Sequence, residues 1–266
     1  MLQIDDVNIR RNAILDGQIE PKVLEAKRHS KKYTKTNPWK IHNKWYNEDV
    51  EIDFIIDLLK KIESDSLTFA AIFAIIFLSG ARLHEILPKI FKNKNKEVIG
   101  TFPGVCVKDI KMKTDKNGIE FLTIRSAVEK LRNKYVKMHP ESKYKTVIIL
   151  ANHPDHKPFI EVLERYSDYL DKIYNGNTSE NVPLFYKITD YSFYRYLVKN
   201  HGINVHIIRH WRAKHLSRIF NFSESDLIAY FGWVQDSVMS HRYSKSSEFA
   251  MMQRQIVNAA ENNIQL

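Results

Sequence analysis

The chain has little cysteine and no long apolar run. Cys106 is the one cysteine among 266 residues, so neither an internal disulfide nor a zinc site built from several cysteines can form. The most apolar stretch, residues 67–78, is too short to cross a bilayer and is followed by Gly80 and Arg82, so it predicts a buried helix. Residues 1–6 lack the basic and apolar regions of a signal peptide. We therefore expect an intracellular, cytoplasmic protein.

Other features that the sequence lacks are an internal repeat, a low-complexity tract and the glycine-rich loop of the common nucleotide-binding motif. Hydrophobic residues make up 44% of the chain and charged residues 27%, which is typical of a globular protein. The charge is unbalanced, with 41 Lys and Arg against 31 Asp and Glu and a net charge of +10. A polyanionic partner follows, with nucleic acid ahead of a membrane surface; the alternative is a basic protein from a lysine-rich proteome.

The excess of positive charge is concentrated near the N-terminus. Residues 27–46 contain no acid, and Tyr33, Trp39, Trp45 and Tyr46 lie between the cations. Such a segment suits phosphate contacts combined with packing on bases or sugars. The alternative is a solvated linker whose aromatic rings pack on the next domain. We predict a basic arm over residues 1–47 and a globular domain over residues 48–266. The candidate DNA-binding cations are Lys27, Arg28, Lys31, Lys32, Lys35, Lys40 and Lys44.

Apolar periodicity predicts a mainly helical domain with a small antiparallel sheet of three strands. Asn117-Gly118 indicates a tight turn between the first two strands. In the helix over residues 206–220, the core positions would be Ile208, Trp211, His215, Leu216 and Ile219. The expected strands are residues 105–112, 119–125 and 146–150. The expected helices are residues 47–62, 67–87 with a break near Gly80, 158–174, 191–199, 206–220 and one starting at 223.

Four residues of this domain together supply what cleavage of a phosphodiester requires. Arg82 and Arg209 can neutralise both non-bridging oxygens of a phosphate, and the hydroxyl of Tyr243 can attack phosphorus. His206 stands three residues before Arg209. Taken singly, three of them have a plainer interpretation. Arg82 could be a helix-end cation, His206 with His210 a zinc pair or structural histidines, and Tyr243 a packing residue.

The order of these motifs resembles that of the tyrosine recombinases, or phage-type integrases. The matching motifs are residues 81–86, His206-x-x-Arg209-His210, Gly232-Trp233 and Tyr243, and the resemblance covers residues 48–245. The glycine-tryptophan pair is closest in character to archaeal and archaeal-virus members. The resemblance implies the tyrosine recombinase catalytic-domain (DNA breaking-rejoining) fold. It also implies a site-specific recombinase in the cytoplasm of a prokaryotic cell or virus-infected host.

The resemblance also implies a reaction and its partners. Tyr243 would form a 3′-phosphotyrosyl link with double-stranded DNA, and rejoining would need no ATP, metal or cofactor. Arg82 and Arg209 would grip the scissile phosphate, and His206 would bind it and assist proton transfer. Trp233 stands where many members have histidine and can donate a hydrogen bond only. Glu85 would support the arginines through a buried hydrogen bond.

The lysine that protonates the leaving oxygen is less well defined. We assign it to Lys130, after the second strand, with Lys134, Lys143 and Lys145 as alternatives, because the loop between the second and third strands is longer than the family's short turn. We expect the helical core-binding domain that is usual in the family to be absent or reduced to the basic arm. Two further function classes therefore stay open: a non-catalytic DNA-binding protein of the same fold, and a type IB topoisomerase.

The last twenty residues carry an apolar stripe. Phe249, Met252, Ile256 and Ala260 recur at helical spacing directly after Tyr243. In the family, such a segment packs on a neighbouring subunit, and we expect DNA-dependent assembly into a tetramer. The alternative is that the segment packs on its own domain.

Overall fold

The computed structural model describes residues 50–93, 95–128, 144–176, 179–186 and 188–231, with residues 252, 255–257, 259, 260 and 264. The chain divides into two units, residues 1–44 and 45–266, and every described residue belongs to the second. The basic arm, Lys130, Trp233, Tyr243 and Phe249 lie outside the described residues. Within those ranges, no helix combines the length and apolarity needed to cross a membrane.

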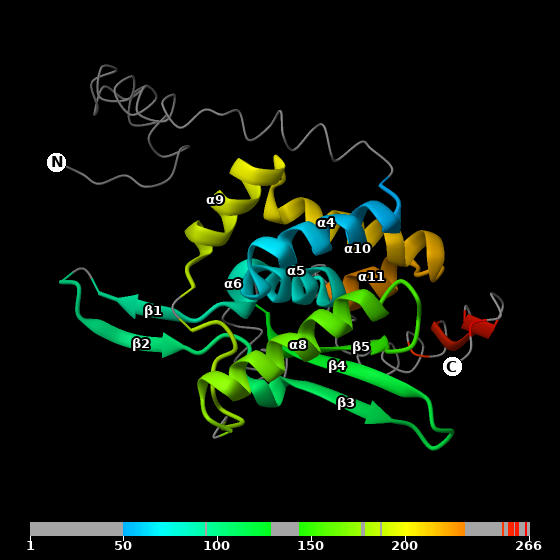
Figure 1. Ribbon diagram of the computed structural model, residues 1–266, viewed down its shortest axis with the longest axis horizontal. Coiled ribbons are helices and arrows are strands. Elements are labelled where there is room, and N and C mark those ends of the chain that lie inside the picture. Colours follow the sequence, from blue (N-terminus) through cyan, green and yellow to red (C-terminus); the bar gives the residue numbers. More distant parts are fainter. Residues whose placement is uncertain are drawn as a thin grey trace, which may run out of the picture. The chain divides into compact units, whose positions relative to one another are not determined.

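The described part of the chain is mainly helical with a small antiparallel sheet, as predicted (Figure 1). A separate two-stranded sheet, β1–β2, was not predicted. The helices are α4 (Ile52–Asp65), α5 (Leu67–Ser79), α6 (Leu83–Ile86), α8 (Lys157–Ile173), α9 (Asp190–His201), α10 (Val205–Ile219) and α11 (Glu224–Phe231). The strands are β1 (Lys89–Lys92), β2 (Val98–Phe102), β3 (Ile110–Thr114), β4 (Glu120–Ala127) and β5 (Tyr144–Leu150).

Helix α5 is the centre of the hydrophobic core. Ser66 caps its N-terminus by accepting a 3.3 Å hydrogen bond from the Phe69 N–H, and Gly80 ends it in the left-handed conformation at φ 59°. Every residue from Ala70 to Ser79 is buried, with α4, α8 and α10 packed around the helix. A helix that is apolar on all sides requires such surroundings.

The three-stranded sheet has the order β3-β4-β5 and is antiparallel throughout. Asp115 Oδ1 accepts hydrogen bonds from the backbone N–H groups of Asn117 and Ile119, and this forms the predicted turn at Asn117-Gly118. The prediction was wrong for residues 105–109. Val105 pairs instead with Ile86 and Leu184 through backbone hydrogen bonds, and residues 107–109 form a 3-10 turn.

Helix α10 buries most of the residues that were predicted to face the core from this helix. Ile208, Trp211, His215 and Leu216 are buried as predicted, but Ile219 is 40% exposed. The helix ends at Ile219, and the chain turns through Asn221 at φ 52°. Phe220 therefore fills the core position in place of Ile219.

The described C-terminal residues lie against the same chain's sheet. Met252 and Ile256 pack on Phe121 and Leu150. The amide of Gln255 accepts a 2.8 Å hydrogen bond from the Leu150 N–H and donates a 3.0 Å bond to the Ile148 carbonyl, so it satisfies part of the open edge of β5. This is the packing on its own domain that we gave as the alternative; assembly into a tetramer stays a prediction.

Candidate functional site

The turn after α5 brings two distant segments into contact. A Cβ atom on Gly80 would lie 2.2 Å from Cε1 of Phe231, so only glycine fits at this position. Phe231 is the last residue of α11 and directly precedes the Gly232-Trp233 pair in the sequence. The close approach thus joins the Gly80–Arg82 segment to the end of α11.

Arg82 is held by Glu85 at the start of α6. Its backbone N–H donates a 2.7 Å hydrogen bond to Glu85 Oε2, and its Nη1 donates a 2.8 Å bond to Oε1. Glu85 is only 1% exposed, whereas the side chain of Arg82 keeps 18% exposure. The expected buried hydrogen bond of Glu85 is therefore present, and it fixes the Arg82 guanidinium with part of its surface open to solvent.

Arg209 approaches the same carboxylate from α10. Its Nη1 lies 3.8 Å from Glu85 Oε2, too far for a hydrogen bond, and its guanidinium carbon lies 5.5 Å from the centre of the Phe231 ring. Arg209 is only 4% exposed, and its Nη1 has no hydrogen-bond partner among the residues that the structure describes. Buried donors are almost always satisfied, so this nitrogen marks a place where a ligand can complete the site.

Lys145 is the third cation of the site. Its Nζ donates 3.1 Å hydrogen bonds to the carbonyls of Ser79 and Tyr230, the residues just before Gly80 and Phe231. Burial lowers the pKa of Lys145 to about 7, because Arg209 and Arg82 add to the desolvation while Glu85 opposes it only in part. An amine with such a pKa can exchange a proton near neutral pH.

Lys145 is one of the four lysines that the sequence offered as a proton donor. Lys130, Lys134 and Lys143 lie outside the described residues. Strand periodicity contained a signal in favour of Lys145, since it alternates with Val147 and Ile149, both buried. A lysine at the start of the core-facing side of a strand points into the protein, and this pattern favours Lys145 over Lys130 and Lys134, while Lys143 shares its parity.

Glu85 neutralises part of this positive charge. Burial alone would raise its pKa, but Lys145, hydrogen bonds from Arg82 and the charge of Arg209 together lower the pKa below its usual value. The carboxylate is thus ionised at neutral pH. One anion shared by Arg82, Arg209 and Lys145 leaves an excess of positive charge, which suits a phosphate group.

His206 lies in the first turn of α10, three residues before Arg209. The side chain of Asn204 caps this helix by accepting a 2.9 Å hydrogen bond from the His206 N–H, and His206 is exposed. The spacing of three residues places His206 and Arg209 on the same side of the helix. Trp233 and Tyr243, the other two predicted residues, lie outside the described residues.

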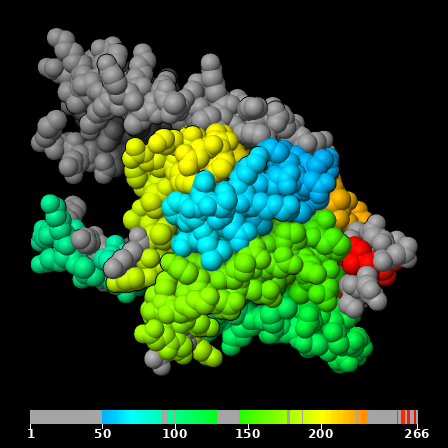
Figure 2. Space-filling view, in the orientation of Figure 1, coloured from blue at the N-terminus to red at the C-terminus, as the bar shows by residue number. Residues whose placement is uncertain are grey.

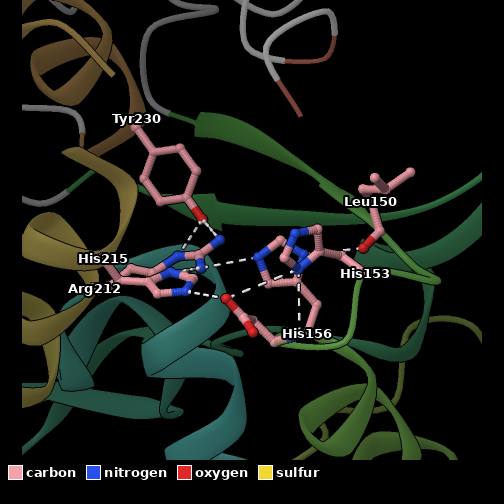
Figure 3. Close-up of polar contacts among 7 residues, drawn as sticks. Leu150, His153, His156, Arg212, His215 and Tyr230 are labelled. Carbon is pink, nitrogen blue, oxygen red and sulfur yellow. Dashed lines mark hydrogen bonds and ion pairs between the residues drawn. The ribbon is translucent and has the colours of Figure 1, made fainter. Parts of the chain in front are cut away.

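A second polar cluster, which the sequence did not suggest, lies one helical turn further along α10 (Figure 3). Arg212 is fully buried and donates from Nε and Nη2 to the hydroxyl of Tyr230, at 3.1 and 3.0 Å. Its Nη1 donates to His156 Nε2 and His215 Nδ1, both at 3.0 Å. Because a guanidinium can only donate, both imidazoles accept here and must be neutral.

The outer nitrogens of these imidazoles are also engaged. His156 donates from Nδ1 to the Leu150 carbonyl at 3.0 Å, and His215 donates from Nε2 to Asp155 at 2.8 Å. Burial lowers the pKa of His156 well below its usual value and that of His215 to about 4, and Arg212 lowers both further. The Arg212 cluster therefore ties α10 to α11 and to the loop before α8, and its polar atoms are already occupied.

In the described ranges, no group of three or more His, Cys, Asp or Glu side chains is arranged to hold a metal ion. Comparison with known proteins returned no matching family model, no matching curated protein and no matching solved structure.

Proposed function

We propose that this chain is a site-specific DNA recombinase of the tyrosine type, with the DNA breaking-rejoining fold. It would cleave and rejoin double-stranded DNA through a 3′-phosphotyrosyl intermediate. The observation that carries the proposal is the convergence of Arg82 and Arg209 on Glu85, with Lys145 held on the carbonyls of Ser79 and Tyr230 beside them and a buried guanidinium nitrogen of Arg209 still without a hydrogen-bond partner among the described residues. Residues far apart in the sequence meet there, and their order along the chain is that of the recombinase motifs.

The scissile phosphate would take the place next to the two guanidinium groups. Phosphoryl transfer depends mainly on positioning and on neutralising the oxygens around phosphorus. The Arg82 guanidinium is held by the hydrogen bond from its Nη1 to Glu85, and Arg209 is held by packing against Phe231, so both are oriented before DNA binds. His206, one turn before Arg209, would donate to the same phosphate.

The residues of this chain can supply each group that the reaction requires. The Tyr243 oxygen attacks phosphorus, the bond from phosphorus to the 5′ oxygen breaks, and the DNA 3′ end becomes joined to the tyrosine. The phenolic proton leaves with the help of His206, and Lys145 gives a proton to the departing 5′ oxygen. Rejoining runs the same steps in reverse, so the bond energy is kept in the phosphotyrosine and no ATP or cofactor is required.

We assign the proton donor to Lys145 in place of Lys130. Of the four candidate lysines, Lys145 is the one that lies within the described residues; its ammonium group is under the electrostatic influence of both arginines, and its pKa of about 7 suits proton donation at neutral pH. Its two carbonyl acceptors leave one N–H of the ammonium for the substrate.

Covalent trapping tests the proposed function. A pool of nicked duplexes with varied sequence would be incubated with the protein; the short 5′-hydroxyl fragment diffuses away after cleavage and leaves a denaturant-resistant adduct. Tyr243→Phe should bind DNA as before and form no adduct, whereas Tyr186→Phe, at an exposed tyrosine, should behave as wild type.

The same experiment separates the alternatives. Trapping at one sequence supports a recombinase, and trapping at many sequences indicates a type IB topoisomerase. Binding without any adduct indicates a non-catalytic DNA-binding protein. An adduct that persists in Tyr243→Phe would show that another residue is the nucleophile.

A further inference from the structure

Strands β1 and β2 form a ribbon that extends away from the helices (Figures 1 and 2). They pair with each other in antiparallel register and are not part of the three-stranded sheet. An isolated pair of strands is marginally stable in water, so this ribbon gains little by itself. Because the ribbon projects from the domain, we expect a partner molecule to contact it.

The ribbon is rich in lysine and exposes apolar side chains. Residues 89–102 contain Lys89, Lys92, Lys94 and Lys96 against a single acid, Glu97. Ile90 and Val98 are 64% and 59% exposed, and the register, in which Lys92 pairs with Val98, places them on the same face. A positively charged ribbon with an apolar face is complementary to a polyanion that also offers apolar contacts.

The base of the ribbon is fixed to the candidate site. A Cβ on Gly104, which has φ 74°, would lie 2.3 Å from the Ile86 carbonyl oxygen, and the Val105 N–H donates a 3.0 Å hydrogen bond to that oxygen. Ile86 ends α6, the helix that begins directly after Arg82. The segments entering and leaving the ribbon are thus clamped together next to the residues that hold Arg82.

We propose that the β1–β2 ribbon is a DNA-binding arm that enters a groove of the duplex beside the phosphate site. The proposal rests on the proposed function, because it takes DNA as the partner. Five residues at about 3.3 Å each give a ribbon of roughly 16 Å, and the major groove is about 12 Å wide and admits a two-stranded ribbon. The lysines would contact phosphates on both sides, and Ile90 with Val98 would contact thymine methyl groups or sugars.

The salt dependence of DNA binding tests this proposal. The ribbon variant carries Lys89→Gln, Lys92→Gln and Lys96→Gln; the matched control carries Lys157→Gln, Lys172→Gln and Lys199→Gln, at exposed lysines of α8 and α9. Affinity for a duplex would be measured by fluorescence anisotropy over a range of salt concentrations. Each lost phosphate contact reduces the log–log slope by about 0.9, so the ribbon variant should lose roughly 2–3 and the control close to nothing.

A second variant separates the apolar contribution. Ile90→Ser with Val98→Ser should weaken DNA binding several-fold and leave the salt slope unchanged. If this variant instead changes the oligomeric state in sedimentation and leaves DNA binding intact, the ribbon is a protein contact and the proposal is wrong.

Lysine acetylation of the wild-type protein removes any dependence on variant folding. Bound duplex should protect Lys96 from acetylation and leave Lys172 reactive. Equal reactivity of Lys96 with and without DNA, or an equal slope in the ribbon variant and wild type, would overturn the ribbon proposal while the proposed function stands. If the wild-type protein does not bind duplex DNA, the proposed function fails, and the ribbon proposal fails with it.

Discussion

Arg209 and Arg212 lie one turn apart on α10, and both are buried, but their surroundings differ. Arg212 donates hydrogen bonds to a tyrosine hydroxyl and to two neutral imidazoles. Arg209 forms an ion pair with a carboxylate at a distance too long for a hydrogen bond, and its Nη1 has no hydrogen-bond partner among the described residues. Burial of a cation therefore does not by itself indicate a role. A satisfied guanidinium holds the fold together, whereas one with a spare donor is available to a ligand.

The two clusters also differ in how they handle charge. Around Arg209, three cations share Glu85, and the pKa of Lys145 falls to about 7. Around Arg212, the described hydrogen-bond partners are neutral, and the carboxylate of Asp155 reaches the cluster through His215. Tyr230 links the two, since its hydroxyl accepts from Arg212 and donates to Leu78 while its carbonyl accepts from Lys145.

The largest effect on activity is expected at Lys145. Lys145→Ala should slow DNA cleavage by about 10²–10⁴-fold, the usual contribution of a general acid. A substrate with sulfur in place of the bridging 5′ oxygen has a better leaving group and should restore most of the rate. Lys130→Ala should slow cleavage much less than Lys145→Ala in the same single-turnover assay. If sulfur rescues Lys130→Ala and not Lys145→Ala, the proton donor is Lys130.

At Arg209, the loss of activity should come without a loss of stability. Arg209→Ala should reduce cleavage by about 10²–10³-fold because a preorganised donor to phosphate is removed. Arg209→Lys should restore little, since an ammonium group does not reproduce the planar guanidinium fork. The free energy of unfolding, from denaturant titration, should change by less than about 1 kcal/mol, because a cation with an unsatisfied donor leaves the interior. Unfolding of the alanine variant at room temperature would show that Arg209 is structural.

Arg212 should show the opposite behaviour. Arg212→Leu leaves acceptors on His156, His215 and Tyr230 without their buried donor, and we expect a loss of about 3 kcal/mol in the free energy of unfolding. Chemical denaturation followed by circular dichroism gives this value. A stability equal to that of wild type would show that the cluster contributes little to the fold.

A smaller effect is expected when the pH is lowered, because the free energy of unfolding depends on the buried histidines. The pKa of His215 is lowered to about 4 and that of His156 is also lowered, so the folded state binds fewer protons than the unfolded state between these values and the ordinary histidine pKa of 6.5. The contribution of these histidines to the free energy of unfolding should be fully present above pH 6.5 and should fall as the pH decreases toward 4. The loss at pH 5 should be about 2 kcal/mol from His215 alone. Thermal unfolding at a series of pH values measures this loss. His215→Gln should make the profile flatter, and an equally steep profile would assign the loss to other groups.

The sequence predicted much of the fold and part of the site. The apolar segment that became α5, the helix over residues 206–220 and the Asn117-Gly118 turn follow from local patterns. Arg82, Glu85 and Arg209 were grouped by motif order, and the structure brings them together. The Arg212 cluster could not be predicted, because its members come from three segments and are joined only by tertiary packing. The β1–β2 ribbon was missed because its strands are short and separated by a lysine-rich turn.

The comparison of Arg209 with Arg212 can be tested directly by covalent trapping under conditions in which both variants are folded. Wild type, Arg209→Ala and Arg212→Leu would be incubated with the trapping substrate at low temperature and pH 8, with folding verified by circular dichroism. The account predicts a Tyr243 adduct in wild type and in Arg212→Leu, and almost none in Arg209→Ala. A folded Arg209→Ala variant that forms adduct at the wild-type rate, or a folded Arg212→Leu variant that forms none, would contradict it.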